Sequence, residues 1–277
     1  MKKLWLSMAV LLASQLFVLG QDLISNTLAG TSYNSIETDT LPNAKNIEQR
    51  LTTERWSRVS LLNLVNDQPS APLDELIRDA IYSFELDQTQ LFKVLTDAPR
   101  NIRFFIPVTT DGGTSIVLNL TRMRVVAEDF KIRLPSGETV IPGPTGLFYW
   151  GVVADDPHSV AVLSLFGDDL RLMIRDRSST YVLGKRQDDS ETYVLFDEQQ
   201  LRQPEPTWVS NTELPTTSQV YTLPASGCVQ VAAEVEFELF QDLDFNFIKV
   251  GNYVLGLFAE TTAAYRNRGL NVQLNEL

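Results

Sequence analysis

Residues 147–184, "LFYWGVVADDPHSVAVLSLFGDDLRLMIRDRSSTYVLG", decide the fold of this chain. Apolar runs in this stretch are separated by short polar turns, at Asp155–Asp156–Pro157 and again at Gly167–Asp168–Asp169. Short strands that recur about every ten residues are typical of a β sandwich or a barrel. The pattern therefore predicts a β-rich domain that is sandwich or barrel-like.

The β pattern extends toward the N-terminus. Residues 102–108 and 114–126 are rich in apolar and β-branched residues, and 129–143 has a strand–turn–strand signal at Pro135–Ser136–Gly137. Before them, Asp87 is a good N-cap for a short helix through 88–98, which Pro99 ends. We assign the β-rich domain to residues 85–201.

The first 84 residues differ from the rest. Two lysines, an apolar stretch and a small Gly20 indicate a signal peptide over 1–20, and hence a protein secreted to the periplasm or the medium. Residues 21–84 are interpreted as a leader with helical stretches from residue 56 onward. A single N-terminal membrane anchor is the alternative to export.

Composition limits the classes of partner. The chain has 277 residues and a formal charge of −12, so nucleic acid and anionic membrane surfaces are excluded as expected partners. It contains one histidine and one cysteine. No zinc site with several histidines can be built from it.

The C-terminal part has a different period. Residues 202–227 are rich in Pro, Thr and Ser and are expected to be a linker. The residues of 229–237 alternate as in a strand. Helical spacing follows from Phe247 to Tyr265, with Phe247, Val250, Val254, Leu257, Phe258, Thr261 and Tyr265 on the apolar face. A further strand begins near Leu270.

Residues 228–277 thus predict a strand–helix–strand unit with parallel strands. Two strands and one helix do not make a stable domain alone, so we expect this unit to be the truncated start of a larger domain. The expected fold class is α+β, with a β-rich domain, sandwich or barrel-like, followed by the beginning of an α/β domain.

A family resemblance rests on these two stretches. The first resembles the propeptide of reprolysin/ADAM-type zinc metallopeptidases, although Phe166–Gly167–Asp168–Asp169–Leu170 stands where that family often has Cys–Gly–Leu–Arg–Gly. The matching positions are Tyr149, Gly151, Pro157, Ser159, Leu163, Ser164, Leu170 and Tyr181. The second is similar to the opening of the catalytic domain in secreted bacterial relatives. Its matching positions are Glu234, Glu236, Phe237, Glu238, Leu239, Phe240, Tyr253, Tyr265 and Leu270, with Glu236 in place of the usual Asp.

The resemblance implies the propeptide portion of a secreted zinc metalloendopeptidase precursor. The β-rich domain would be the propeptide, and residues 228–277 would be the truncated start of an α/β metzincin-like domain. The propeptide would assist folding of its own or a cognate peptidase domain and keep it latent. Such enzymes bind zinc through two histidines one helical turn apart, and this chain lacks them. Zinc would therefore act only in the full-length protein, which would supply its ligands. The chain itself is expected to be inactive.

Two metal-related hypotheses concern single residues. Cys228 is either one half of a structural disulfide, which we favour, or a switch thiolate that occupies the zinc position. Glu234, Glu236 and Glu238 are predicted to share one strand face. We favour a solvated face for them, and the resemblance implies a structural calcium site as the alternative. His158 follows a turn and is expected to be an ordinary surface residue.

A second functional hypothesis belongs to another class. The chain could be a stand-alone secreted binding or inhibitor module, in which 228–277 closes over the β-rich domain. The strand expected near Leu270 argues against it, since that strand is predicted to lack neighbours.

Overall fold

A computed structural model of the chain describes residues 42–66, 82–109, 113–134, 136–140, 146–186, 191–200, 228–266 and 271–277. The predicted signal peptide and the predicted linker 202–227 lie outside these residues. Among the helices described, none is long and apolar enough to cross a membrane.

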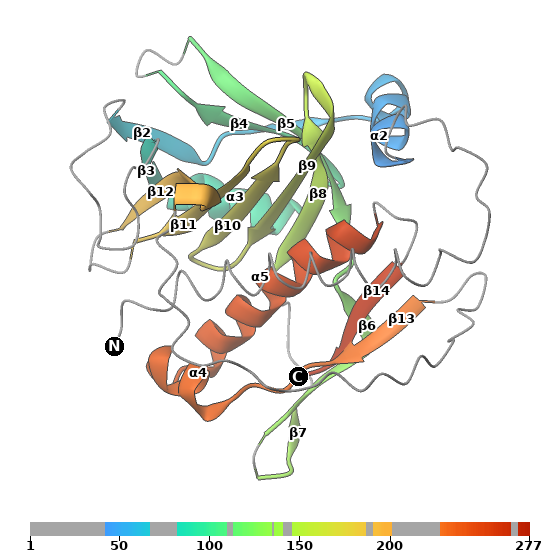
Figure 1. Cartoon of the computed structure of the whole chain (residues 1–277), viewed down its shortest axis with the longest axis vertical. Helices are drawn as coiled ribbons and strands as arrows, with labels where there is room; N and C mark the ends of the chain where they lie inside the picture. The colour runs from blue at the N-terminus through green and yellow to red at the C-terminus, as the bar shows by residue number, and fades with distance from the viewer. Residues whose placement is uncertain are drawn as a thin grey trace.

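One ten-stranded sheet dominates the molecule (Figure 1). Neighbouring strands are antiparallel except β1 and β4, which are parallel. In spatial order the strands are β1 (Ser57–Val59), β4 (Asn101–Pro107), β5 (Ser115–Met123), β8 (Leu147–Val153), β9 (Asp156–Leu165), β10 (Leu170–Arg175), β11 (Thr180–Lys185), β12 (Thr192–Asp197), β3 (Tyr82–Leu86) and β2 (Leu62–Asn66). The strands predicted from 102 to 184 are confirmed. Because there is one curled sheet here, the barrel-like form of the prediction holds and the two-sheet sandwich does not.

The two edges of this sheet belong to one short segment. β1 and β2 are its first and last strands in space, yet only Ser60 and Leu61 separate them in the chain. The Leu61 carbonyl accepts a hydrogen bond from the Asp87 amide at 2.8 Å. The helical interpretation of this segment is wrong, because 57–66 gains its hydrogen bonds from strands distant in sequence. A sheet whose edges meet in this way exposes few unpaired backbone groups.

The concave side of the sheet is filled by large side chains. Phe84, Phe104, Tyr149 and Tyr193 are fully buried there among leucines and isoleucines from most of the strands. Helix α3 (Gln88–Asp97) adds Leu91 and Val94 to this interior. The predicted cap is confirmed, since the Asp87 carboxylate accepts from the Gln90 amide at 3.0 Å.

A second sheet of four strands stands beside the first (Figure 1). Its order is β13 (Cys228–Ala232), β14 (Asn271–Glu276), β6 (Val126–Arg133) and β7 (Thr139–Val140). β13 and β14 are parallel, which confirms the predicted strand–helix–strand unit. β14 also pairs with β6, so the expectation that the last strand lacks neighbours is wrong.

Two helices connect β13 to β14. The predicted strand 229–237 is too long, because pairing with β14 stops at Ala232 and α4 (Phe237–Asp242) begins soon after. The predicted helix is α5 (Phe247–Arg266). Its buried residues are Val250, Leu255, Gly256, Ala259, Thr262 and Ala263. Of the expected face, Val250 is therefore confirmed, and Val254 and Phe258 are partly buried against the same cluster. Phe247 stays 56% exposed.

The outer face of the sheet carries the remaining helices. Helix α2 (Pro42–Thr53), which precedes β1, buries Ile47, although its sequence has no sustained helical period. A single turn, η2 (Glu198–Gln200), follows β12.

Gly151 in β8 is required by close packing, because any Cβ there would overlap the Asn119 carbonyl of β5.

Candidate functional site

The clearest candidate site is a contact between two parts of the chain. One part is the β-rich region, by which we mean the strands from β1 to β12 with helix α3, and the other is the unit 228–277. Strand β6 comes from the β-rich region and lies directly beside β14. The Leu274 amide donates to the Val125 carbonyl at 2.9 Å, and the Leu277 amide to Lys131 at 3.1 Å. The Arg133 amide donates back to the Leu277 carbonyl at 2.7 Å. The C-terminal unit is therefore bound by strand addition, a general mode of polypeptide recognition.

Charged side chains secure the end of this strand pair. Glu276 of β14 contacts Arg133 at 2.6 Å and Lys131 at 3.1 Å, both on β6. The hydrogen bond from Arg133, followed by that from Lys131, lowers the pKa of the Glu276 carboxyl. Arg133 is exposed, and Lys131 and Glu276 are partly exposed, so these ion pairs fix the register more than they add stability.

Helix α5 packs on the outer face of the ten-stranded sheet. Leu255, Ala259 and Ala263 meet outward-facing residues of β8 and β9, and Leu274 of β14 joins the same cluster. The sheet's contribution to that cluster is Met123, Phe148, Val160, Val162 and Phe166. Small residues on the buried stripe of α5 let the helix axis approach the sheet closely. The helix thus seals an apolar surface that β8 and β9 alone would expose.

A polar contact crosses the same interface. Arg171 of β10 lies over Gly256, and its guanidinium carbon is 5.3 Å from the ring centroid of Tyr253. Its Nη1 also donates to the Tyr253 carbonyl at 3.5 Å. Burial raises the pKa of the nearby Glu260 carboxyl, while attraction to Arg171 acts in the opposite direction. Arg171 is thus a charged residue of the sheet that faces α5 and Glu260.

The C-terminal end of α5 contacts the loop before β6. Arg266 donates from Nη2 to the Arg124 carbonyl at 3.2 Å and to Asn271 Oδ1 at 3.4 Å. Burial lowers the pKa of Arg266, while Cys228 acts to raise it. The Thr262 hydroxyl, fully buried, donates to the Val272 carbonyl at 3.3 Å. Helix and strand of the C-terminal unit are therefore locked together where they meet β6.

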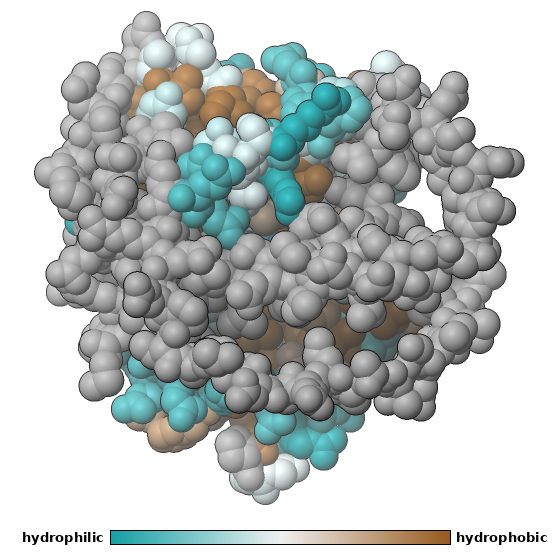
Figure 2. Space-filling model, viewed as in Figure 1, coloured by the Kyte–Doolittle hydropathy of each residue, from teal (hydrophilic) through white to brown (hydrophobic). Residues whose placement is uncertain are grey.

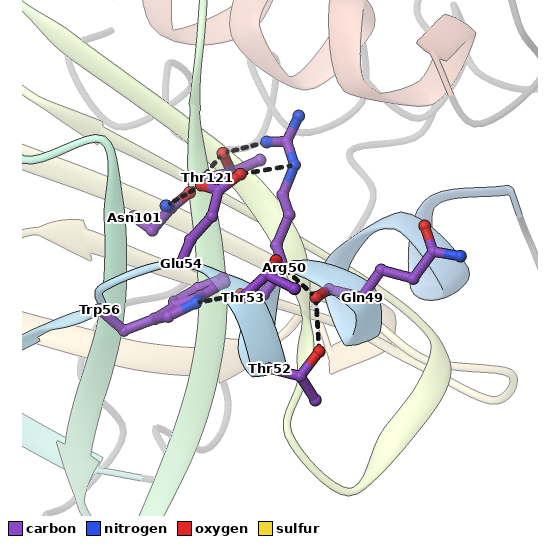
Figure 3. A network of polar contacts seen from close by, with 8 residues as sticks. All are labelled: Gln49, Arg50, Thr52, Thr53, Glu54, Trp56, Asn101 and Thr121. Carbon is purple, nitrogen blue, oxygen red and sulfur yellow. Dashed lines mark hydrogen bonds and ion pairs between the residues drawn. The ribbon is translucent and has the colours of Figure 1, made fainter.

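A separate polar network holds α2 against the sheet (Figure 3). Arg50 donates to the Thr121 hydroxyl at 2.8 Å, and Asn101 donates to Glu54 at 2.6 Å. The Thr121 hydroxyl donates to Asn101 Oδ1 at 2.9 Å, which closes the network. Asn101 and Thr121 are buried, so each needs these partners. The side chains satisfy one another, as expected of an anchor for the helix.

The residues predicted to bind metal are not brought together. Cys228 is exposed at the start of β13. Glu234 follows that strand, Glu236 is the N-cap of α4 and Glu238 is in its first turn, so the three do not share a strand face. Across the described part of the chain, no three His, Cys, Asp or Glu residues form a group that could hold a metal ion.

His158 lies in strand β9, just after the turn, where its amide donates to Asp156 Oδ1 at 2.9 Å. The turn itself, at Ala154–Asp155, is close to the predicted position. The important residues that the sequence did not single out are Lys131, Arg133 and Arg171. Their signal is weak, because an isolated basic residue in a strand does not say which segment it will face.

Comparison with known proteins adds no family. No family model matches the chain, and no curated protein is similar to it. The resemblance to reprolysin-type precursors therefore stays a hypothesis from the sequence.

Proposed function

We propose that this chain is the propeptide-bearing part of a secreted zinc metalloendopeptidase precursor. In this proposal the ten-stranded sheet holds the unit 228–277, assists its folding and keeps the peptidase domain latent. The observation that carries it is the insertion of β14 between β13 and β6, with α5 packed on the outer face of β8 and β9.

Physical reasons support a holding function. The strand–helix–strand unit would leave one side of β14 and the buried stripe of α5 uncovered if it stood alone. An uncovered strand edge and an apolar helix face favour aggregation. The β-rich region covers both, as a folding assistant should. Zinc would polarise the peptide carbonyl and activate water in the full-length enzyme, with ligands that these 277 residues do not supply.

A cleavage experiment tests the holding function. A specific protease site is introduced between residues 210 and 216, and the folded protein is cut there. We expect the two fragments to co-elute in size-exclusion chromatography and to separate only in denaturant. Separation under native conditions would contradict the proposal. A protein with the site but without protease treatment is the control.

The second candidate is a stand-alone secreted binding or inhibitor module. One observation favours it, since β14 has neighbours on both sides and the unit closes over the β-rich region as that hypothesis requires. Sequencing the transcript beyond codon 277 separates the two candidates. An in-frame His-Glu-x-x-His-x-x-Gly-x-x-His motif would support the precursor, and a reproducible stop codon would support the binding module.

A further inference from the structure

An apolar corner of mostly exposed side chains, four of them phenylalanines, lies where α4 meets the start of α5. We call Phe237, Phe240, Phe245, Phe247 and Ile248 the phenylalanine corner. Phe237 is 65% exposed, Phe245 54% and Ile248 74%. The rings touch one another, since the Phe240 centroid is 5.5 Å from that of Phe245 and 4.6 Å from that of Phe247. In Figure 2, apolar and hydrophilic residues lie side by side at the place of α4.

The backbone that carries these rings is strained at the turn between α4 and α5. Asp244 and Phe245 have φ of 58° and 56°, a left-handed conformation that bulky residues rarely adopt. The turn is held by the hydrogen bond from the Phe245 amide to the Phe240 carbonyl at 2.9 Å and by the Lys249–Asp244 ion pair at 2.8 Å. Strained residues gather at functional sites more often than elsewhere. Here the strain keeps an aromatic ring in solvent, where it contributes little to the core.

Charge indicates the kind of partner. Residues 234–249 contain five carboxylates and one lysine, and Glu236, Glu238 and Asp242 are exposed around the rings. An anionic membrane would be repelled by such a rim, and a second copy of the chain would bring the same negative charges together. A basic segment is attracted to it, and apolar side chains on that segment would cover the rings.

We propose that the phenylalanine corner is a docking site for a polypeptide segment whose apolar side chains are flanked by lysine or arginine. The aromatic rings are the anchors of such an interface, and the carboxylates form its polar rim. This partner is distinct from the β-rich region, which contacts Leu255, Ala259 and Ala263 further along α5.

The test uses a labelled amphipathic peptide of leucine and lysine, with a lysine–serine peptide of equal charge for comparison. Binding is measured by fluorescence anisotropy for the whole protein and for the double variant Phe245→Asn/Ile248→Ser. Asparagine tolerates the left-handed conformation. Phe92→Ser is the matched control, because Phe92 on α3 is 71% exposed and lies outside the corner.

We expect the double variant to bind the leucine–lysine peptide at least about ten-fold more weakly, with Phe92→Ser unchanged. Unchanged affinity in the double variant would overturn the proposal. The proposal would also be overturned if the whole protein bound phosphatidylserine vesicles and the double variant did not, because the partner would then be a membrane. Self-association that the double variant loses would overturn it too, because the partner would then be a second copy of the chain. Should the double variant misfold by near-UV circular dichroism, Glu238→Lys/Asp242→Lys replaces it, and retained affinity there overturns the proposal equally.

Discussion

The two faces of the ten-stranded sheet are built from different side chains. The concave face is closed by large, fully buried residues such as Phe104, Tyr149 and Tyr193. The outer face meets the small residues of α5 with apolar side chains such as Phe148 and Val162, and it adds the contact of Arg171 with Tyr253. The first resembles the core of a domain, and the second resembles an interface between domains, which is more polar. This contrast supports the proposal that the β-rich region folds as one body and holds the C-terminal unit as a second.

The largest effect is expected on the concave face. Phe104→Ala removes a fully buried ring and should lower the free energy of unfolding by about 3–5 kcal/mol. Because this interior is shared by most strands of the ten-stranded sheet, the β-rich region should unfold as a whole. The unit 228–277, which the β-rich region holds, should lose structure with it. Urea unfolding followed by circular dichroism measures the loss. A change below about 1 kcal/mol would contradict this view of the interior.

An intermediate effect is expected at the interface. Ala259 is fully buried between α5 and the sheet, so Ala259→Leu should cost about 1–3 kcal/mol through overpacking. Proteolysis should then cut 228–277 first, with the β-rich region intact. Ala264→Leu, on a more exposed position of the same helix, is the matched control and should change little. If proteolysis cut the β-rich region and the unit 228–277 at the same rate in Ala259→Leu, the two would unfold as a single body.

A smaller effect depends on pH. Burial raises the pKa of Glu260, so the unfolded chain ionises before the folded one as pH increases. Stability relative to Glu260→Gln should therefore be greatest below the unfolded pKa of about 4.3 and fall as pH rises through the folded pKa. Urea unfolding between pH 4 and 8 checks the sign. If the stability of the wild-type protein relative to the variant rises with pH, attraction to Arg171 has a larger effect on the pKa of Glu260 than burial has.

The smallest effect belongs to Glu276, which titrates in the opposite sense. The hydrogen bond from Arg133 lowers its pKa, so its contribution is present above about pH 4.3 and disappears as pH falls through the folded value. Glu276→Gln should lower stability slightly at neutral pH and not at all in strong acid. Added salt should shrink the difference, because Arg133 is exposed and Glu276 partly so. A difference that persists in strong acid would refute the assignment.

The parts of this fold that the sequence predicted depend on local pattern. Asp87 caps its helix through its own side chain, and the turns near Asp155 and Gly167 separate strands by local chemistry. The closing segment 57–66 was missed because its strands exist only through partners distant in the chain. Likewise, the pairing of β14 with β6 joins residues more than 130 positions apart, which periodicity does not report.

The candidate site was less predictable than the fold for a related reason. The exposed Glu234, Glu236 and Glu238 drew attention because they alternate in sequence, yet the strand ends before them. No sequence pattern singles out Arg171, although it lies over Gly256 and Tyr253. An interface is defined by which surfaces meet, and single-residue chemistry says little about that.

Hydrogen exchange on the intact protein tests the central claim most directly. We predict that the amides of Leu274 and Leu277 exchange slowly, because they donate to Val125 and Lys131 of the β-rich region. In Ala259→Leu these amides should become fast while those of β9 and β10 stay protected. Fast exchange at Leu274 and Leu277 in the unmodified protein, beside a protected β9, would show that the β-rich region does not hold the C-terminal unit.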